Sequence, residues 1–367
     1  MADRIKVGII GVGQIGKRHV DRYKNIAGAE IVAVADVNEA EAKRVGEACG
    51  AKHVFTDFRK LLELDEIRAV DVCLHNNLHA PVSIAAMEAG KDVFCEKPLA
   101  GSYADAKTMV AARERTGRAL GMQAASLFSK EGKAAKRLID DGQLGKLYYA
   151  KSSHYRRRGR PFVDGYGTSN FVKKEIAAGG ALYDMGIYQI VLCLHLLGNP
   201  EILTISGATH QETPMYEDRR TESGYDVEEL GLGFVRLGGG VSFFIEEAWA
   251  INLGGTDGTK IAGSKAGVTL NPFAYHTTLS DMEMDASVNL GAADSRWHSC
   301  LQDYDGYDSP QHNWIATLQG RVPTIDTAAY GLAMMLIAEG IFLSQKLGRE
   351  VTPKEVEEAS VSTAVVL

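Results

Sequence analysis

Residues 5–16 read IKVGIIGVGQIG, and this stretch decides the fold. The β-branched run over 5–10 predicts a strand, and the segment after the glycines can be helical to about Tyr23. In a strand–glycine turn–helix unit, the first glycine makes the turn, the second lets a pyrophosphate approach the helix N-terminus, and the third allows helix and strand to pack. The sequence therefore predicts a dinucleotide site formed by Gly11, Gly13, Gln14, Ile15 and Gly16.

The acidic residue after the next apolar run indicates which dinucleotide binds. The run from Glu30 to Ala35 is followed by Asp36, 20 positions after Gly16. A carboxylate at this place accepts hydrogen bonds from the ribose hydroxyls of NAD and repels the 2′-phosphate of NADP. We therefore predict NAD as the cofactor.

Strand-like and helix-like segments alternate from Asp36 to residue 123. Strands are expected at 53–56, 69–74, 92–95 and 119–123, and helices at 39–49, 58–64 and 103–115. This alternation predicts an α/β Rossmann domain over residues 1–123, with a doubly wound parallel sheet. Ligands bind at the carboxyl ends of parallel strands, so we expect the polar residues that follow these strands to line the cofactor site: Asn76, Asn77, His79, Glu96, Lys97 and Gln123.

The pattern changes after residue 146. Strands are expected at 147–155, 201–208, 229–237, 241–250 and 259–262, with Gly238–Gly240 as a hairpin turn. The sequence therefore predicts an α+β domain over residues 124–367. Within it, the polar segment 280–307 is expected to be an insertion or a mobile loop, and 327–346 an amphipathic helix that packs back on the first domain.

A second candidate site lies in AGGALYDMGIYQIVLCLHLLG, residues 178–198. Its apolar residues recur at helical spacing, so Asp184 and Tyr188, four positions apart, share one helix face. Ionisable side chains on an otherwise buried helix are costly unless they are paired or used. From this helix alone a structural pair and a functional site remain equally open. The preceding Gly179-Gly180 pair permits close approach of a backbone or a ligand.

Composition excludes several classes of partner. The 367 residues carry a net charge of -7, which gives no electrostatic footprint for nucleic acid or an anionic membrane. The five widely spaced cysteines fit reduced thiols, and no secretory leader or long apolar span is recognisable. We expect a cytoplasmic protein. His75 and His79 lack a third ligand at a recognisable spacing, so no metal is predicted.

Four motifs in this order resemble the Gfo/Idh/MocA oxidoreductases: the glycine fingerprint, Asn77-x-His79, Glu96-Lys97-Pro98, and Gly179-Gly180 followed by Asp184 and Tyr188. The resemblance implies a Rossmann domain followed by a domain whose open, mostly antiparallel sheet forms the substrate wall. That sheet often forms the oligomer interface, so a homodimer or homotetramer is implied. Two departures stand out, because Tyr188 is histidine in many members and His75-Asn76 replaces the usual Thr-Pro.

The same resemblance implies a catalytic set of Lys97, Asp184 and Tyr188. We expect Tyr188 to be the acid/base, helped by the Lys97 ammonium, because a nearby cation favours the phenolate. Asp184 would orient the substrate or share the proton. The loop 156–167 carries a basic run, which is usually a solvated surface. Alternatively it covers the pocket, with Tyr155, Arg158 and Tyr166 contacting substrate alongside the catalytic set.

The implied activity is NAD-dependent hydride transfer at a secondary alcohol of a sugar or glycoside, with C3 of a glucoside favoured. Trp249, Trp297 and His298 are further pocket candidates, because sugars stack on aromatic rings, although such residues are more often core or interface. Three alternatives remain: an inositol or free-sugar dehydrogenase, an NAD-dependent redox glycosidase, and a dinucleotide-binding regulator without catalysis. The intact catalytic set argues against the last.

Overall fold

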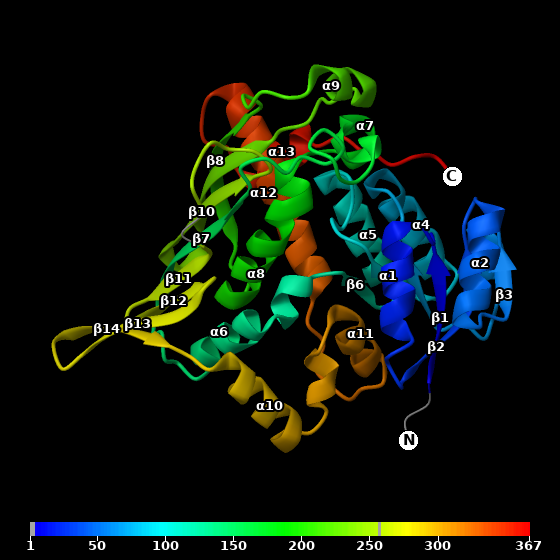
Figure 1. The fold of residues 1–367 in the computed structure, drawn as a ribbon, viewed down its shortest axis with the longest axis horizontal. Helices are drawn as coiled ribbons and strands as arrows, with labels where there is room; N and C mark the ends of the chain where they lie inside the picture. Colours follow the sequence, from blue (N-terminus) through cyan, green and yellow to red (C-terminus); the bar gives the residue numbers. More distant parts are fainter. Residues whose placement is uncertain (1–3, 256–257) are drawn as a thin grey trace.

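The computed structural model describes residues 4–255 and 258–367, which form a parallel-sheet unit beside a larger, splayed sheet (Figure 1). The first sheet has six parallel strands in the order β3-β2-β1-β4-β5-β6. These strands are β1 (Ile5–Ile10), β2 (Ala29–Ala35), β3 (His53–Phe55), β4 (Ala69–Val72), β5 (Asp92–Cys95) and β6 (Leu120–Met122). The predicted doubly wound parallel sheet is therefore confirmed.

Helices cover both faces of this sheet, so its central strands are buried on both sides, as is usual for parallel sheets. The helices are α1 (Gln14–Tyr23), α2 (Glu39–Cys49), α3 (Phe58–Leu62), α4 (Asn76–Glu88) and α5 (Tyr103–Thr116). Between the two sheets the chain forms η1 (Ala125–Phe128) and α6 (Lys130–Asp140).

The second sheet has eight strands in the order β14-β13-β12-β11-β7-β10-β9-β8. Among the described residues, β7 and β10 are the only pair of parallel strands in this sheet, so the expected open, mostly antiparallel sheet is confirmed. The strands are β7 (Leu147–Tyr155), β8 (Ile202–His210), β9 (Leu230–Leu237), β10 (Val241–Ala248), β11 (Lys260–Gly263), β12 (Ala266–Leu270), β13 (Phe273–Leu279) and β14 (Met282–Ser287). The turn η4 (Gly238–Gly240) joins β9 to β10 as predicted.

Of the two expectations for residues 280–307, an insertion or a mobile loop, the loop is wrong. Ser280 and Asp281 both adopt positive φ and turn the chain from β13 into β14, after which α10 (Leu290–Cys300) and η5 (Tyr304–Tyr307) follow. The hairpin projects from the sheet edge (Figure 1), so most of its side chains are exposed and its pattern carries no buried face. Period-2 alternation marks a strand only when one face is buried.

Shorter helices complete the second half of the chain: η2 (Ser169–Val172), α7 (Lys174–Ala177), the π-helical turn η3 (Leu182–Gly186), α8 (Ile187–Leu197), α9 (Glu217–Ser223), α11 (Pro310–Leu318) and α13 (Pro353–Ala359). The long helix α12 (Thr327–Leu347) lies between the two sheets (Figure 1). A Cβ on its Gly331 would lie 2.8 Å from the sulfur of Met122 in β6, and one on its Gly340 2.4 Å from Ile205 in β8. The helix therefore packs on both units.

Two helical stretches, Lys174–Leu197 and Thr327–Leu347, are long and apolar enough to cross a membrane. However, 78% and 61% of their apolar windows are buried inside the protein, as in core helices. They contribute to one continuous hydrophobic cluster that runs from the parallel sheet through α8 and α12 to the second sheet.

Candidate active site

The glycine turn leaves open space at the N-terminus of α1. A Cβ on Gly11, whose φ is 88°, would lie 2.4 Å from the carbonyl oxygen of Cys73, and one on Gly16 would lie 2.1 Å from the carbonyl oxygen of Gly11. These two glycines are needed for packing. A Cβ on Gly13 would meet no atom within 4 Å. The open position, together with Gln14 and Ile15 in the first turn of α1, fits a pyrophosphate at a helix N-terminus.

Asp36 is held against this turn. Its Oδ2 accepts a hydrogen bond from the backbone N–H of Val12 at 2.8 Å, and its Oδ1 accepts one from that of Asn38 at 2.9 Å. A carboxylate offers about four acceptor positions, so both oxygens retain capacity for ribose hydroxyls. The placement of Asp36 at the carboxyl end of β2 thus fits the predicted NAD ribose contact.

The residues after β4 serve mainly to join chain segments. Asn76 Nδ2 donates to the carbonyl oxygen of Ala177 at 2.8 Å, and Asn77 Nδ2 to that of Glu175 at 3.4 Å, so both tie the start of α4 to α7. His79 is fully buried, with Nδ1 2.7 Å from the carbonyl oxygen of Pro98 and Nε2 3.1 Å from that of Leu74. Its side chain cannot reach a cofactor, and it braces the turn after Lys97 instead.

Glu96 also faces inward, toward a residue that the sequence reasoning missed. His19 of α1 is fully buried, with Nδ1 2.8 Å from Asp71 Oδ2 and Nε2 2.8 Å from Glu96 Oε1. Glu96 Oε2 accepts from the backbone N–H of Lys97 at 2.9 Å. Glu96 is only 5% exposed and its side chain bonds inward to His19 and to the Lys97 backbone, so it positions Lys97 and, contrary to prediction, does not face the cofactor. The sequence reasoning missed His19 because its partner Glu96 is distant in sequence, so no local pattern indicates the pair.

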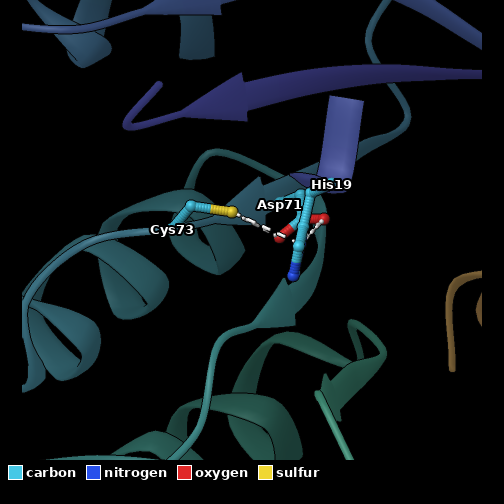
Figure 2. Close-up of side chains that lie close together, drawn as sticks. All are labelled: His19, Asp71 and Cys73. Carbon is cyan, nitrogen blue, oxygen red and sulfur yellow. Dashed lines mark hydrogen bonds and ion pairs between the residues drawn. The ribbon is translucent and has the colours of Figure 1, made fainter. Parts of the chain in front are cut away.

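The His19 ring acts as a buried donor on both sides. Burial alone would lower its pKa, but the Asp71 carboxylate and the Cys73 thiol outweigh burial and raise the pKa of His19 well above its usual value. Figure 2 shows the side chains of His19, Asp71 and Cys73 close together, and Cys73 Sγ lies 3.3 Å from Asp71 Oδ1. In a tetrahedral zinc site with bonds of about 2.0–2.1 Å, N and O ligands lie about 3.3 Å apart. The 2.8 Å contact between His19 and Asp71 fits a shared proton instead.

Lys97, Asp184 and Tyr188 come together at the carboxyl end of β5. Lys97 Nζ donates to Asp184 Oδ1 and to the Asp184 carbonyl oxygen, both at 2.9 Å. Trp249, which is fully buried, donates from Nε1 to Asp184 Oδ2 at 3.0 Å. Lys97 Nζ lies 4.8 Å from the centre of the Tyr188 ring. The ammonium thus contacts the ring face of Tyr188, while its hydrogen bonds go to Asp184 rather than to the phenol oxygen.

Both members of the Lys97–Asp184 pair are charged at neutral pH. Burial alone would lower the pKa of Lys97, but the carboxylates of Asp184 and Glu96 and the neighbouring Tyr188 outweigh it, and the pKa lies above its ordinary value. Burial likewise opposes ionisation of Asp184, yet the Lys97 ammonium and the Trp249 hydrogen bond lower its pKa. The pair is a fixed ammonium–carboxylate, beside which the half-buried Tyr188 presents its phenol.

The Gly179-Gly180 pair admits a backbone rather than a ligand. A Cβ on Gly180 would lie 1.9 Å from the carbonyl oxygen of Glu228, the residue that precedes β9 by two positions. That oxygen accepts from the N–H of Ala181 at 3.2 Å. Only glycine therefore fits at position 180, and the contact sets where the segment carrying Asp184 begins.

The loop 156–167 places a different arginine near the site from the one expected. Arg156 Nη1 donates to the Tyr166 hydroxyl at 2.8 Å, and that hydroxyl donates to the Gly159 carbonyl at 2.7 Å. Arg156 contributes to lowering the pKa of Asp184, whereas burial raises the pKa of Tyr166 to about 12. Arg158 instead donates to the Pro214 carbonyl at 2.7 Å and lies over the ring of Tyr216. A run of arginines gives no local signal that distinguishes one member from another.

Other pocket candidates fall outside this cluster. The Tyr155 hydroxyl donates to the Gly255 carbonyl. Strand alternation puts Tyr155 on one face of β7 and Ser152 on the other. Ser152 hydrogen-bonds Glu247, which lies next to Gly186. Trp297 lies under Arg137, and His298 bonds Asp308 at 2.5 Å. Gln123 follows β6, and its buried Oε1 has no partner among the described residues, so this acceptor is available to a ligand at the same sheet edge.

Comparisons with known proteins show which families and proteins this chain resembles. A family model described as the oxidoreductase family with an NAD-binding Rossmann fold matches residues 5–124, and one for the GFO/IDH/MocA C-terminal domain matches residues 133–269. D-glucoside 3-dehydrogenase of Escherichia coli is 26% identical over 355 residues, which cover 95% of this chain and 97% of that protein. Inositol 2-dehydrogenase of Salmonella paratyphi B is 31% identical over 205 residues, 55% of this chain and 56% of that one.

Solved structures share the fold over nearly the whole chain. Levoglucosan dehydrogenase in complex with NADH superposes with a TM-score of 0.79 at 20% identity, covering 95% of this chain and 99% of that one. The aldose-aldose oxidoreductase of Caulobacter crescentus gives a TM-score of 0.74 at 22% identity, covering 95% and 99%.

Proposed function

Because the chain belongs to the Gfo/Idh/MocA family of NAD-binding oxidoreductases, we propose that it oxidises a secondary alcohol of a sugar or glycoside. The observation that carries the proposal is the meeting of Lys97, Asp184 and Tyr188 at the carboxyl end of β5, in the same sheet whose glycine turn receives NAD. An ammonium, a carboxylate and a phenol provide the acid/base groups that such an oxidation needs.

Each residue has a distinct task in this mechanism. NAD, when bound, supplies the hydride acceptor, held by the glycine turn, Asp36 and the free Gln123 acceptor. Tyr188 takes the proton from the substrate hydroxyl, and the Lys97 ammonium at 4.8 Å from its ring centre stabilises the phenolate. Asp184 holds Lys97 in place and, through its second oxygen, is itself held by Trp249.

The favoured substrate is a glucoside oxidised at C3. This assignment is supported by the near full-length similarity to a D-glucoside 3-dehydrogenase. Inositol and free sugars are the second candidates, favoured by the shorter match to an inositol 2-dehydrogenase. The rim formed by Arg156 and Tyr166 would contact the substrate or its aglycone, with the Tyr166 phenol neutral because its pKa is raised to about 12 by burial.

One experiment separates these activities. Purified protein is incubated with NAD and either methyl β-glucoside, glucose or myo-inositol, while nicotinamide absorbance and product mass are followed together. We expect NADH and a glucoside product lighter by two hydrogens. Release of free sugar without net NADH would show a redox glycosidase instead, and oxidation of myo-inositol alone would move the assignment to a cyclitol. NAD binding without turnover of any of them would support a regulator.

We also propose a cytoplasmic homo-oligomer that associates through the second sheet. Three aromatic rings share one face of this sheet: Phe244, which is 42% exposed, lies 4.9 Å from Phe234 and 5.8 Å from Tyr149 between ring centres. Exposed apolar clusters of this kind mark interaction surfaces. Light scattering on the purified protein tests the association, and Phe244→Lys should yield monomers if the sheet face forms the interface.

A further inference from the structure

Glu228 is a buried carboxyl group for which the mechanism above has no role. Its side chain is only 8% exposed, although glutamate is rarely buried without a partner. Its Oε2 accepts from the N–H of Gly180 at 2.8 Å, and its Oε1 accepts from that of Leu182 at 3.0 Å. Its own carbonyl oxygen takes the intervening N–H of Ala181. One residue thus satisfies three consecutive N–H groups.

Those three N–H groups lie at the start of the segment that carries the catalytic side chains. The first N–H groups of a helix have no partner within the helix, and a carboxylate near them is favourable both as an acceptor and toward the helix dipole. The π-helical turn η3 follows at once and contains Asp184, and α8 contains Tyr188. No side chain of the segment itself caps η3.

We infer that Glu228 is a positioning residue for the reaction, whose carboxylate fixes the start of η3 and thereby holds Asp184 and Tyr188 in register with Lys97. The restraint is transmitted over a short path. The Asp184 N–H donates to the Gly180 carbonyl at 2.9 Å, so a shift of Gly180 moves Asp184 directly. A misplacement of about 1 Å can cost about 10²-fold in rate.

The restraint depends on the ionised form of Glu228. A carboxylate accepts both hydrogen bonds well, whereas a protonated carboxyl keeps one good acceptor and leaves one N–H without a full partner. Burial raises the pKa of Glu228 to about 7, although the two N–H groups favour its ionised form. The Glu228 carboxyl therefore changes its ionisation near neutral pH, and it accepts both N–H groups fully only above that pH.

Several charged or titratable groups face Glu228. Lys174 of α7 lowers the pKa of Glu228 by its charge. Tyr183 of η3 and Tyr225 both interact electrostatically with Glu228, and both phenols are neutral because burial raises their pKa. Glu229 is paired with Arg160 at 2.8 Å, so its charge is compensated. Lys174 is exposed and is therefore the group that can be altered without disturbing the core.

The kinetic test, which rests on the proposed function, compares Glu228→Gln with wild type. In wild type we expect kcat to fall as the pH drops through about 7. In the variant, the amide cannot accept both N–H groups at any pH. We expect kcat about 10-fold below the wild-type plateau, with the pH dependence that Glu228 contributes removed and only that of the proton transfer itself left, and an unchanged KM for NAD.

Asp92→Asn is the matched control. Its buried carboxylate also accepts a backbone N–H, that of Ala119 at 2.9 Å, but it lies at the start of β5, the strand end opposite to Lys97. We expect this variant to lose stability while keeping the wild-type pH profile. If Glu228→Gln keeps the wild-type kcat and pH profile, the inference is wrong. Lys174→Met is the second variant, used if Glu228→Gln does not fold. It should move the acid limb of kcat to higher pH. An acid limb that does not move would count equally against the inference.

Amide hydrogen exchange tests the same device without any turnover, so it separates failure of this inference from failure of the proposed function. After correction for intrinsic exchange, protection of the amides of residues 180–184 should rise as the pH passes 7 in wild type. It should shift with Lys174→Met, while Asp92→Asn leaves it unchanged. If the protection of these amides changes neither with pH nor in Lys174→Met, the proposed role of Glu228 is wrong, even if the enzyme oxidises glucosides as proposed.

Discussion

Asp184→Asn should separate stability from catalysis. The substitution leaves the Lys97 ammonium without its carboxylate, in a site where the two side chains are 12% and 22% exposed. Removing one partner of a buried ion pair costs about 3–5 kcal/mol, and the partial exposure places this pair at about 3 kcal/mol. The kcat should fall by at least about 10²-fold, because the ammonium is no longer held beside Tyr188.

The double variant Lys97→Met, Asp184→Asn provides the decisive comparison. With both charges gone, most of the lost free energy of unfolding should return, while kcat should not recover. Urea denaturation and NADH absorbance measure the two quantities on the same preparations. If the loss in free energy of unfolding for Lys97→Met simply adds to that for Asp184→Asn, Lys97 and Asp184 do not stabilise the protein as an ion pair.

The pH dependence of this stability difference has a defined sign. The folded pKa of Asp184 is lowered, so its contribution is present above the usual aspartate pKa of about 3.9 and is lost as the pH falls through the folded value. The gap in stability between wild type and Asp184→Asn should therefore be constant around neutral pH and shrink on acidification. A gap that widens in acid would contradict the assignment of Asp184 as the ionised partner.

Three further predictions concern the cofactor, the catalytic pair Lys97 and Tyr188, and the rim. Asp36→Ser should relax the preference for NAD over NADP in a binding titration, because it removes the charge that repels the 2′-phosphate; equal affinities in wild type would refute this. Lys97→Ala and Tyr188→Phe should each lower kcat by about 10²–10⁴-fold with NAD binding retained. The kcat of the double variant should be little lower than that of the less active single variant, whereas strictly additive losses in kcat would mean that the two residues have separate tasks. Tyr166→Phe releases Arg156 from its 2.8 Å hydrogen bond and should raise KM for the sugar more than it lowers kcat, as measured in initial-rate assays; a change in kcat alone would place Tyr166 in the chemistry.

The first sheet was predictable because its signals are local. The run over residues 5–10, the three glycines and Asp36 each act within about 30 positions of one another. The buried strands of a parallel sheet read as apolar runs, and these were found within one or two residues of their ends, although β4 ends at Val72 rather than at residue 74.

The inward-facing supports of the site were not predictable, because each is made by residues far apart in sequence. His19 meets Glu96 across 77 positions, and Glu228 meets Gly180 across 48. No propensity or periodicity marks a buried carboxyl that binds backbone N–H groups, since its alternative in the sequence is an ordinary surface glutamate. The meeting of Lys97 with Asp184, 87 positions apart, was expected from family resemblance rather than from pattern.

The position of α12 bears on how the protein unfolds. β6 is the edge strand of the parallel sheet, and its Met122 N–H donates to Thr327 Oγ1 at 2.8 Å, at the start of α12. A fragment ending at residue 123 would expose that edge and the apolar surface that Gly331 covers, which is the usual template for aggregation. Most of α12 in turn belongs to the core beneath β8. The two sheets therefore share one cooperative unit, and heating should melt them in a single transition in spite of the two-domain plan of the chain.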